Sequence, residues 1–296
     1  MDIHEQNFLG LPKQFSERTN SPFIVLPIPY ELTTTYLQGT SHGPGAIIKA
    51  SQQVELYDEE LDVEAYRKGI HTAPALKLKR SPERAMEAIC QEISTILSEG
   101  KFPIALGGEH TLSVGAIRAF ADRYHDLSIL QLDAHADLRD EYEGSKFNHA
   151  CTMRRILEHA PAVQVGIRSL SLEEADYIRE MNLRLFSSRR IQDSRPWDEI
   201  TSALSDHVYV TIDLDVFDPA VMPSVGTPEP GGLGWYDVLD LLRTVARETT
   251  IVGFDVVELC PQPGNIAPDF FAARLIYKII GSIAISRGRQ REQVTS

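Results

Sequence analysis

Three short clusters of acidic residues and histidines carry most of the chemistry that this sequence offers. They read DAHAD at 133–137, DLD at 213–215 and GGEH at 107–110, and each directly follows a run of apolar residues. Side chains two residues apart on an extended chain point to the same side, so the polar members of each cluster converge. Such convergence of carboxylates and imidazoles is typical of a metal site.

Four of these side chains are aspartates, and their charge indicates which ligand they would hold. Carboxylates crowded into one cleft repel one another and are costly to desolvate, and two divalent cations would neutralise four negative charges. Mixed Asp and His ligation suits Mn, Fe, Co or Zn better than Ca. A pair of metals about 3.5–4 Å apart can activate water as a nucleophile at neutral pH. The candidate metal ligands are His110, Asp133, His135, Asp137, Asp213 and Asp215.

Helix or turn capping is the structural alternative for each cluster. A single Asp at the end of a strand more often caps a helix or a turn than binds a metal. A single histidine is likewise more often structural than a ligand. Three such clusters at strand ends in one chain are poorly explained by capping, so the sequence favours a binuclear metal site.

The elements that must position these clusters are alternating apolar runs and amphipathic stretches. Apolar runs predict strands at Phe23–Ile28, Pro103–Leu106, Ser128–Leu132, Val163–Ile167, Leu183–Phe186, Val208–Ile212 and Ile251–Val256, with a weaker pattern at Gly69–Leu78. Helical periodicity predicts helices at Gly45–Tyr57, Pro82–Ser98, Leu112–Arg123, Ala150–His159, Leu172–Met181, Trp235–Arg247 and Asp269–Ala284.

Apolar strands that alternate with helices indicate a parallel sheet covered on both faces. We therefore expect an α/β protein with a single three-layer α/β/α domain over residues 1–296, of which residues 1–20 form a surface N-terminal segment. In such sheets the functional residues gather at the carboxyl ends of the strands. All three clusters lie there.

Composition limits the class of protein. The chain has 296 residues, is 43% hydrophobic and carries a formal net charge of −13. This charge argues against a nucleic-acid partner, which normally meets a basic face. It is compatible with a cationic substrate, and equally with an acidic surface that only aids solubility.

Cysteine usage and the N-terminal sequence bear on the compartment. Cys90, Cys151 and Cys260 form no CxxC pair, which favours a reducing cytoplasm over a disulfide framework. We expect Cys151 and Cys260 to be buried small side chains. The polar N-terminal residues do not resemble a signal peptide, and no run approaches the roughly 18 apolar residues of a membrane helix. A cytoplasmic protein with no membrane partner is expected.

These motifs resemble the signatures of the ureohydrolase family, which contains the arginases and agmatinases. The resemblance covers nearly the whole chain, and its matching segments are PIPYELTTTYLQGTSHGPGAI (27–47), GGEH (107–110), DAHAD (133–137), DLDVFDP (213–219), GTPEPGGL (226–233) and DVVELCP (255–261). It implies an arginase-like domain around a parallel sheet of about eight strands. It also implies two Mn²⁺ per subunit and a homo-oligomer, either a trimer or a hexamer.

The resemblance also assigns roles to individual residues. It divides the metal ligands into His110 and Asp137 at the first ion, His135 and Asp215 at the second, and Asp133 and Asp213 bridging both. His149, in Asn148-His149-Ala150-Cys151, matches the histidine that exchanges protons with solvent. Glu258 matches the glutamate that orients the guanidinium, and Asp137 passes on a proton. The implied products are urea and a primary amine.

The family resemblance also suggests the substrate, a small cationic guanidino compound. Ser169, a substrate-binding candidate together with His149 and Glu258, stands where arginases carry an aspartate for the α-amino group. The stretch with Glu141 and Glu143 is acidic where arginases place partners for the α-carboxylate. A site without such partners rejects an amino-acid head, so agmatine, which yields putrescine, fits best.

Several alternatives stay open. The longer N1-aminopropylagmatine is not separable from agmatine by sequence. Arginine, a guanidino acid or formiminoglutamate would want a cation in the cleft, for which Arg168 and Lys146 are the candidates near the motifs. A catalytically silent regulatory member is the non-enzyme alternative, and the full set of metal ligands together with His149 and Glu258 argues against it.

Overall fold

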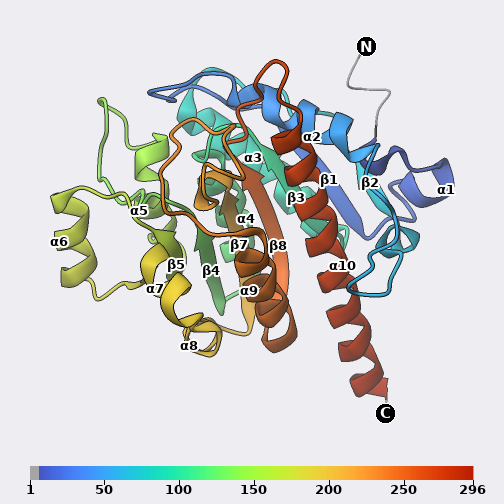
Figure 1. Cartoon of the computed structure of the whole chain (residues 1–296). Helices are drawn as coiled ribbons and strands as arrows, with labels where there is room; N and C mark the ends of the chain where they lie inside the picture. Colours follow the sequence, from blue (N-terminus) through green and yellow to red (C-terminus); the bar gives the residue numbers. More distant parts are fainter. Residues whose placement is uncertain (1–6, 296) are drawn as a thin grey trace.

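Eight parallel strands form one sheet at the centre of the computed structural model, which describes residues 7–295 (Figure 1). In spatial order they are β2 (Ile70–Thr72), β1 (Phe23–Ile28), β3 (Phe102–Gly107), β8 (Thr250–Val257), β7 (His207–Asp213), β4 (Leu127–Leu132), β5 (Ala162–Ile167) and β6 (Arg184–Ser187). Every residue of β1, β3 and β4 is buried, as expected for strands covered on both faces. The structure confirms the predicted α/β fold class.

Helices cover both faces of this sheet. They are α1 (Lys13–Ser16), α2 (Gly43–Ser51), α3 (Pro82–Ser98), α4 (Leu112–Arg123), α5 (Thr152–Ile156), α6 (Leu172–Glu180), α7 (Ser188–Ser194), α8 (Trp197–Ser202), α9 (Trp235–Glu248) and α10 (Ala267–Thr295). In Figure 1, α2, α9 and α10 lie in front of the sheet, and α3 and α4 lie behind it. Two apolar cores result, one under α2, α9 and α10 and the other under α3, α4 and α5.

Local sequence explains where the clearest helices begin. Ser81 caps α3 by accepting a hydrogen bond from the Arg84 backbone N–H, and Pro82 occupies the first helical turn, where its missing N–H is not needed. Ser171 and Glu174 form a reciprocal capping box at the start of α6. These signals agree with the helix starts that the sequence predicts.

Several predicted elements differ from the structure. The helix predicted at Gly45–Tyr57 ends at Ser51, and Ala150–His159 contains only a 3₁₀ turn at His149–Cys151 followed by α5. The weak strand pattern Gly69–Leu78 shortens to β2. The short helices α7 and α8 have no matching sequence prediction, because their helical periodicity spans too few residues to stand out.

The N-terminal segment is less superficial than the sequence predicts. Residues 1–6 lie outside the described residues, and Phe8, Leu9 and Leu11 are buried in the core under α2 and α10. Backbone N–H groups of Phe8 and Leu9 donate to the hydroxyls of Thr72 and Ser51. Exposed residues between 12 and 20 therefore lie at the surface, as expected. The apolar side chains before them are instead buried and cover the edge of the sheet.

The order of the strands decides where the motifs meet. β3, β8, β7 and β4 are consecutive neighbours at the centre of the sheet. Their register places Leu106, Val256, Ile212 and Leu132 in one row across these strands. The residues that follow this row therefore emerge side by side at the carboxyl end of the sheet.

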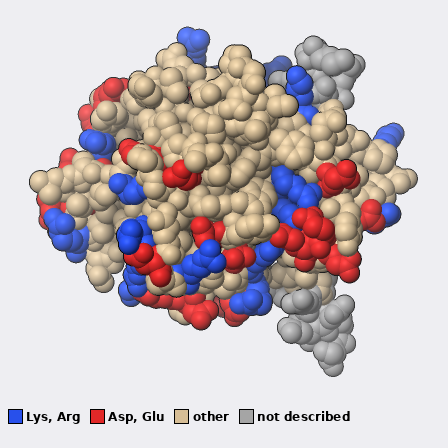
Figure 2. All heavy atoms as spheres, viewed as in Figure 1, with Lys and Arg blue, Asp and Glu red and all other residues tan. Residues whose placement is uncertain are grey.

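The outer surface shows mixed charge. On the face drawn in Figure 2, acidic and basic side chains are interspersed over its lower part, and this face shows no continuous basic area. Within residues 7–295 no helix has the length and apolar character needed to cross a membrane.

Candidate metal centre

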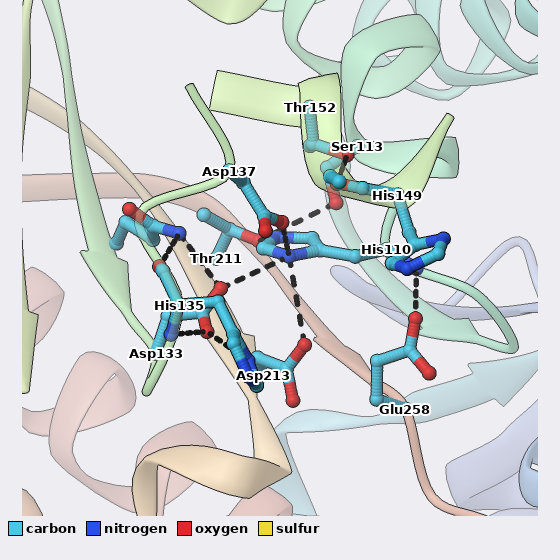
Figure 3. Close-up of polar contacts among 12 residues, drawn as sticks. His110, Ser113, Asp133, His135, Asp137, His149, Thr152, Thr211, Asp213 and Glu258 are labelled. Atoms are coloured by element: carbon cyan, nitrogen blue, oxygen red, sulfur yellow. Dashed lines mark hydrogen bonds and ion pairs between the residues drawn. The ribbon is translucent and has the colours of Figure 1, made fainter. Parts of the chain in front are cut away.

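Four adjacent strand ends supply the side chains of one buried cluster. Asp213 is the last residue of β7, and Asp133 directly follows β4. His110 and Glu258 follow β3 and β8 within three residues. All four are buried, and Figure 3 shows their side chains pointing toward a common centre. The structure brings together the three sequence clusters.

His110 faces three of the aspartates. Its Nδ1 lies 3.2 Å from Asp133 Oδ2, 3.2 Å from Asp137 Oδ2 and 3.6 Å from Asp213 Oδ2 (Figure 3). This nitrogen is buried and has no hydrogen-bond partner in the structure. A buried imidazole nitrogen without a hydrogen bond, aimed at several carboxylates, is the arrangement of a metal ligand.

His135 forms the second half of the cluster. Its Nδ1 lies 2.8 Å from Asp215 Oδ2 and 3.7 Å from Asp133 Oδ1. The ligand atoms of His110, Asp133 and Asp213 lie within 4.8 Å of one another, as do those of Asp133, His135 and Asp215. Asp133 belongs to both groups, so two cation positions would share this carboxylate.

A buried hydrogen-bond network orients His110. Its Nε2 lies 2.9 Å from Thr211 Oγ1, and that hydroxyl donates to Asp255 at 2.6 Å. Asp255 also accepts from Ser113 and Tyr209 at 2.8 and 2.7 Å. Because the Thr211 hydroxyl donates its only proton to Asp255, it can only accept a hydrogen bond from His110. The Nε2 of His110 therefore carries the proton and donates it, and Nδ1 keeps its lone pair. The sequence analysis did not identify this network. Its one visible signal in the sequence is Asp255, a carboxylate within the apolar strand β8.

The pKa values show how costly the crowding is. Burial, followed by the charges of Asp215 and Asp133, raises the pKa of Asp213 well above its ordinary value. Burial and the Asp133 charge raise the pKa of Asp137 to about 6. The pKa of Asp133 itself is lowered, because the adjacent imidazoles of His110 and His135 outweigh its burial. Divalent cations would relieve this repulsion, and the mixed nitrogen and oxygen donors fit borderline metals.

Glu258 forms the wall opposite this cluster. Its backbone has φ 65°, a left-handed conformation that is rare outside glycine and recurs at functional sites. Its Oε1 accepts from the His110 backbone N–H at 2.7 Å, and its own N–H donates to Gly108 at 2.8 Å. Burial, and then the charge of Glu109, raises the pKa of Glu258 well above its ordinary value. The carboxylate is thus pre-positioned for a cationic partner.

His149 lies at the side of the same cavity. It begins the 3₁₀ turn His149–Cys151, which the Asn148 side chain caps by accepting from the Ala150 N–H. His149 is half-buried. Its imidazole and the Tyr142 ring form a T-shaped pair, and their centroids lie 6.3 Å apart. This position combines access to the metal cluster with access to solvent.

A cavity of about 300 Å³ joins these groups. Ser169, the sequence candidate for substrate contact, lines it together with Ser171 and Glu174 of the α6 cap. The segment Thr34–Leu37 forms another part of the wall. Sequence reasoning missed Glu174, whose capping-box spacing indicates a helix start and not a binding site.

The acidic stretch before His149 does not line this cavity. Glu141 and Glu143 are exposed on a tight turn closed by Tyr142 and Ser145, and among the described lining residues this stretch contributes only Tyr142. Glu141 and Glu143, which make this stretch acidic, therefore lie outside the described cavity wall. Alternation of side chains along the turn points Tyr142 inward and its acidic neighbours outward.

The two cations considered for a carboxylate substrate are committed elsewhere. Arg168 donates to backbone carbonyls of the metal-site loops, including those of Asp215 at 2.7 Å and Glu229 at 2.7 Å. Lys146 is exposed and lies 3.7 Å from Asp140. Arg139, which sequence reasoning missed, lines the cavity with its guanidinium 4.8 Å from the centre of the Tyr142 ring.

The cysteines near the motifs are buried, as predicted. Cys151 is fully buried and Cys260 is 5% exposed, and both are free thiols. Burial, and then the charge of Asp137, raises the pKa of Cys151 to about 11. A thiol in this state is a poor nucleophile.

Comparison with known proteins identifies the class. The model of the Arginase family matches residues 21–281, so the chain belongs to this family and is a hydrolase of the ureohydrolase type. It is 42% identical to an N(1)-aminopropylagmatine ureohydrolase of Synechocystis sp., over 94% of this chain and 97% of that protein. It is 33% identical to an agmatinase of Pyrococcus horikoshii, over 90% and 93% of the two chains.

A solved structure agrees with this placement. The crystal structure of the agmatine ureohydrolase of Thermoplasma volcanium superposes with a TM-score of 0.84 at 32% sequence identity, and the match covers 92% of each chain. The arrangement of eight parallel strands is therefore shared with a protein of the same family.

Removal of divalent ions should destabilise the protein. Exhaustive chelation leaves the buried carboxylates unneutralised, so we expect a lower melting temperature. The free energy of unfolding should fall by ~4 kcal/mol relative to protein in metal at a thousand times its dissociation constant. Urea release should vanish, and Mn²⁺ should restore both properties. Full activity in a preparation that elemental analysis finds metal-free would contradict a metal centre.

Substitution of a buried carboxylate of the cluster should remove the metal. Asp213→Asn keeps the shape of the side chain but removes its charge. We expect turnover to fall by at least about 100-fold, because loss of a ligand should cost more than loss of a residue that only hydrogen-bonds to a ligand. Asp62→Asn, at an exposed position far from the cluster, is the matched control and should keep both turnover and metal content. Normal turnover with two bound ions in Asp213→Asn would show that the ligands are misassigned.

Proposed function

We propose that this protein is a binuclear manganese hydrolase that releases urea from a guanidino polyamine. The observation that carries the proposal is the sharing of buried Asp133 between the His110 and His135 groups, in a site whose cavity Glu258 also lines. His110 and Asp137 would hold one Mn²⁺, His135 and Asp215 the other, and Asp133 and Asp213 both. When bound, the metal pair supplies a nucleophile derived from water at neutral pH.

Glu258 binds and orients the guanidinium in this proposal. Its carboxylate lines the cavity and already accepts the His110 N–H, which keeps it directed toward the metal ligands. A carboxylate and a planar guanidinium form a charge-assisted pair that fixes both position and orientation. The contact also offsets the positive charge of the group under attack, so the central carbon faces the cluster.

Two further groups move protons. The amine is a poor leaving group until it is protonated, and Asp137, which lines the cavity beside His110, is placed to pass a proton to it. His149, at the solvent-accessible side of the cavity, exchanges protons with bulk water, as suits an imidazole. The products would be urea and a primary amine.

N1-aminopropylagmatine is the substrate that we propose. The sequence motifs place agmatine first, but relatives named for the longer polyamine in Synechocystis sp. and Thermus thermophilus are 42% and 40% identical, against 33% for the agmatinase of Pyrococcus horikoshii. Both substrates share the guanidinobutyl group, so the same reactive centre serves both.

The cavity wall supports a cationic tail. Apart from the metal ligands and Glu258, Glu174 is the carboxylate among the described lining residues, and it is 4% exposed. It accepts from the backbone N–H groups of Leu138 and Ser171 at 2.9 and 2.7 Å, which hold it in place. Leu170 and Leu37 add apolar surface for the methylene chain.

One observation favours a second candidate, a guanidino acid. Arg139 lines the cavity, and its guanidinium could pair with a substrate carboxylate. The nearby Glu174 opposes this candidate by repelling such a carboxylate. A homo-oligomer and a cytoplasmic location stay predictions from the sequence.

A panel of guanidino compounds tests the substrate. With Mn²⁺ present, we expect the kcat/KM of urea release to be highest for N1-aminopropylagmatine, and at least ~100-fold higher than for arginine, because a head group left without partners is strongly rejected. Comparable values for arginine or guanidinobutyrate would refute the polyamine assignment while leaving the hydrolase intact. Absence of urea from every compound would support a silent family member.

A charge-neutral variant tests the tail contact. Glu174→Gln should raise the KM for N1-aminopropylagmatine about tenfold, since a hydrogen bond to a charged group contributes roughly 1.5–3 kcal/mol. Metal content should stay unchanged. Glu173→Gln removes a neighbouring exposed charge from the same helical turn and should leave the KM as it is. Equal KM values for both variants would exclude Glu174 from substrate binding.

A further inference from the structure

Thr33, which lies outside the metal motifs, connects the metal-binding strand β3 to His149. Thr33 is half-buried in the segment that follows β1. Its Oγ1 donates a short hydrogen bond to Glu109 Oε1 and accepts one from the His149 backbone N–H at 3.1 Å. The same oxygen lies 3.4 Å from His149 Nδ1. One hydroxyl therefore contacts both the main chain and the ring of His149.

Glu109 determines the direction of the hydroxyl proton of Thr33. This carboxylate is fully buried next to His110 and accepts from the backbone N–H groups of Leu32 and Thr33 at 2.8 and 2.6 Å. It also accepts from the hydroxyls of Thr33 and Thr111. A hydroxyl has a single proton, so Thr33 Oγ1 can only accept hydrogen bonds from His149.

The segment that carries Thr33 is fixed to the end of β3 by its backbone. The Glu109 N–H donates to Tyr30 at 2.8 Å, and the Gly108 N–H donates to Ile28 at 3.1 Å. A side chain at position 108 would collide with the Tyr30 carbonyl oxygen, so glycine permits this approach. Thr33 thus occupies a position that is built into the fold.

The direction of the Thr33 hydrogen bonds determines which ring nitrogen of His149 carries the proton. A ring nitrogen that faces an acceptor must carry the proton, so Nδ1 is the protonated nitrogen and Nε2 keeps the lone pair. The backbone contact fixes the residue while the ring contact selects its rotamer and tautomer. Nε2 is then the atom that takes up and releases the exchanged proton.

We propose that Thr33, held by Glu109, is a positioning residue that sets the orientation and tautomer of His149. This inference rests on the proton-exchange role of His149 in the proposed function. Thr33 itself does not touch the reacting atoms. Its loss should slow proton exchange while leaving substrate affinity and the metal ligands in place.

The first experiment removes the hydroxyl while keeping the side-chain shape. With saturating agmatine or N1-aminopropylagmatine and Mn²⁺, Thr33→Val should lower the kcat for urea release about tenfold, because a misplaced catalytic group loses much of its effect. KM and metal content should change little. Thr33→Ser keeps the hydroxyl and should restore most of the kcat. Thr95→Val removes a hydroxyl from the exposed face of α3 and should match the wild type.

A double-mutant cycle separates positioning from general damage. His149→Ala alone should lower kcat by about 100-fold, the lower limit for a lost acid or base. If Thr33 acts through His149, Thr33→Val should lower kcat no further in the His149→Ala background. Thr33→Ala serves as a second hydroxyl-free variant if the valine protein folds poorly.

Each outcome has one meaning. Wild-type kcat in Thr33→Val and Thr33→Ala, with His149→Ala impaired, would overturn the positioning role alone. An equal loss in the presence and absence of His149 would also overturn it, since Thr33 would then act elsewhere. Wild-type kcat in His149→Ala would instead refute the proton-exchange role in the proposed function.

Discussion

Repulsion among carboxylates buried at the ends of neighbouring strands is the constraint on which the rest of this structure depends. Asp133 and Asp213 emerge from adjacent strands β4 and β7, and the pKa of Asp213 rises because burial and its acidic neighbours disfavour a second charge. Two imidazoles facing these oxygens provide nitrogen donors in the same space. Divalent cations would relieve this repulsion, so metal binding and folding stability should be coupled.

The surroundings of the cluster are arranged to keep its ligands in place without metal. Thr211 and Asp255 orient His110 from within the sheet, and Arg168 ties the loops after β5 and β7 together through their carbonyl oxygens. Asp137 and Glu258 adopt left-handed backbone conformations that cost free energy and persist because the neighbouring structure dictates them. These two strained residues are the ones that would move a proton and hold the guanidinium.

Substrate choice depends on side chains that the motifs do not contain. The exposed Glu141 and Glu143 face away from the cavity, whereas Glu174 from the α6 cap and Arg139 line it. The tail of the substrate, and not its guanidinium, is the part that this wall would distinguish.

The sequence by itself determined the fold class and the three clusters of candidate metal ligands, because strand periodicity and the spacing of polar residues at strand ends are local properties. The candidates His149 and Glu258 came from the family resemblance. It predicted seven strands closely and missed α7 and α8, whose periodicity is too short to detect. Only the tertiary structure decided the strand order that unites four motifs, the inward direction of Glu174, and the contact of Thr33 with Glu109 and His149. Those contacts join residues more than 70 positions apart, and no local pattern encodes such a distance.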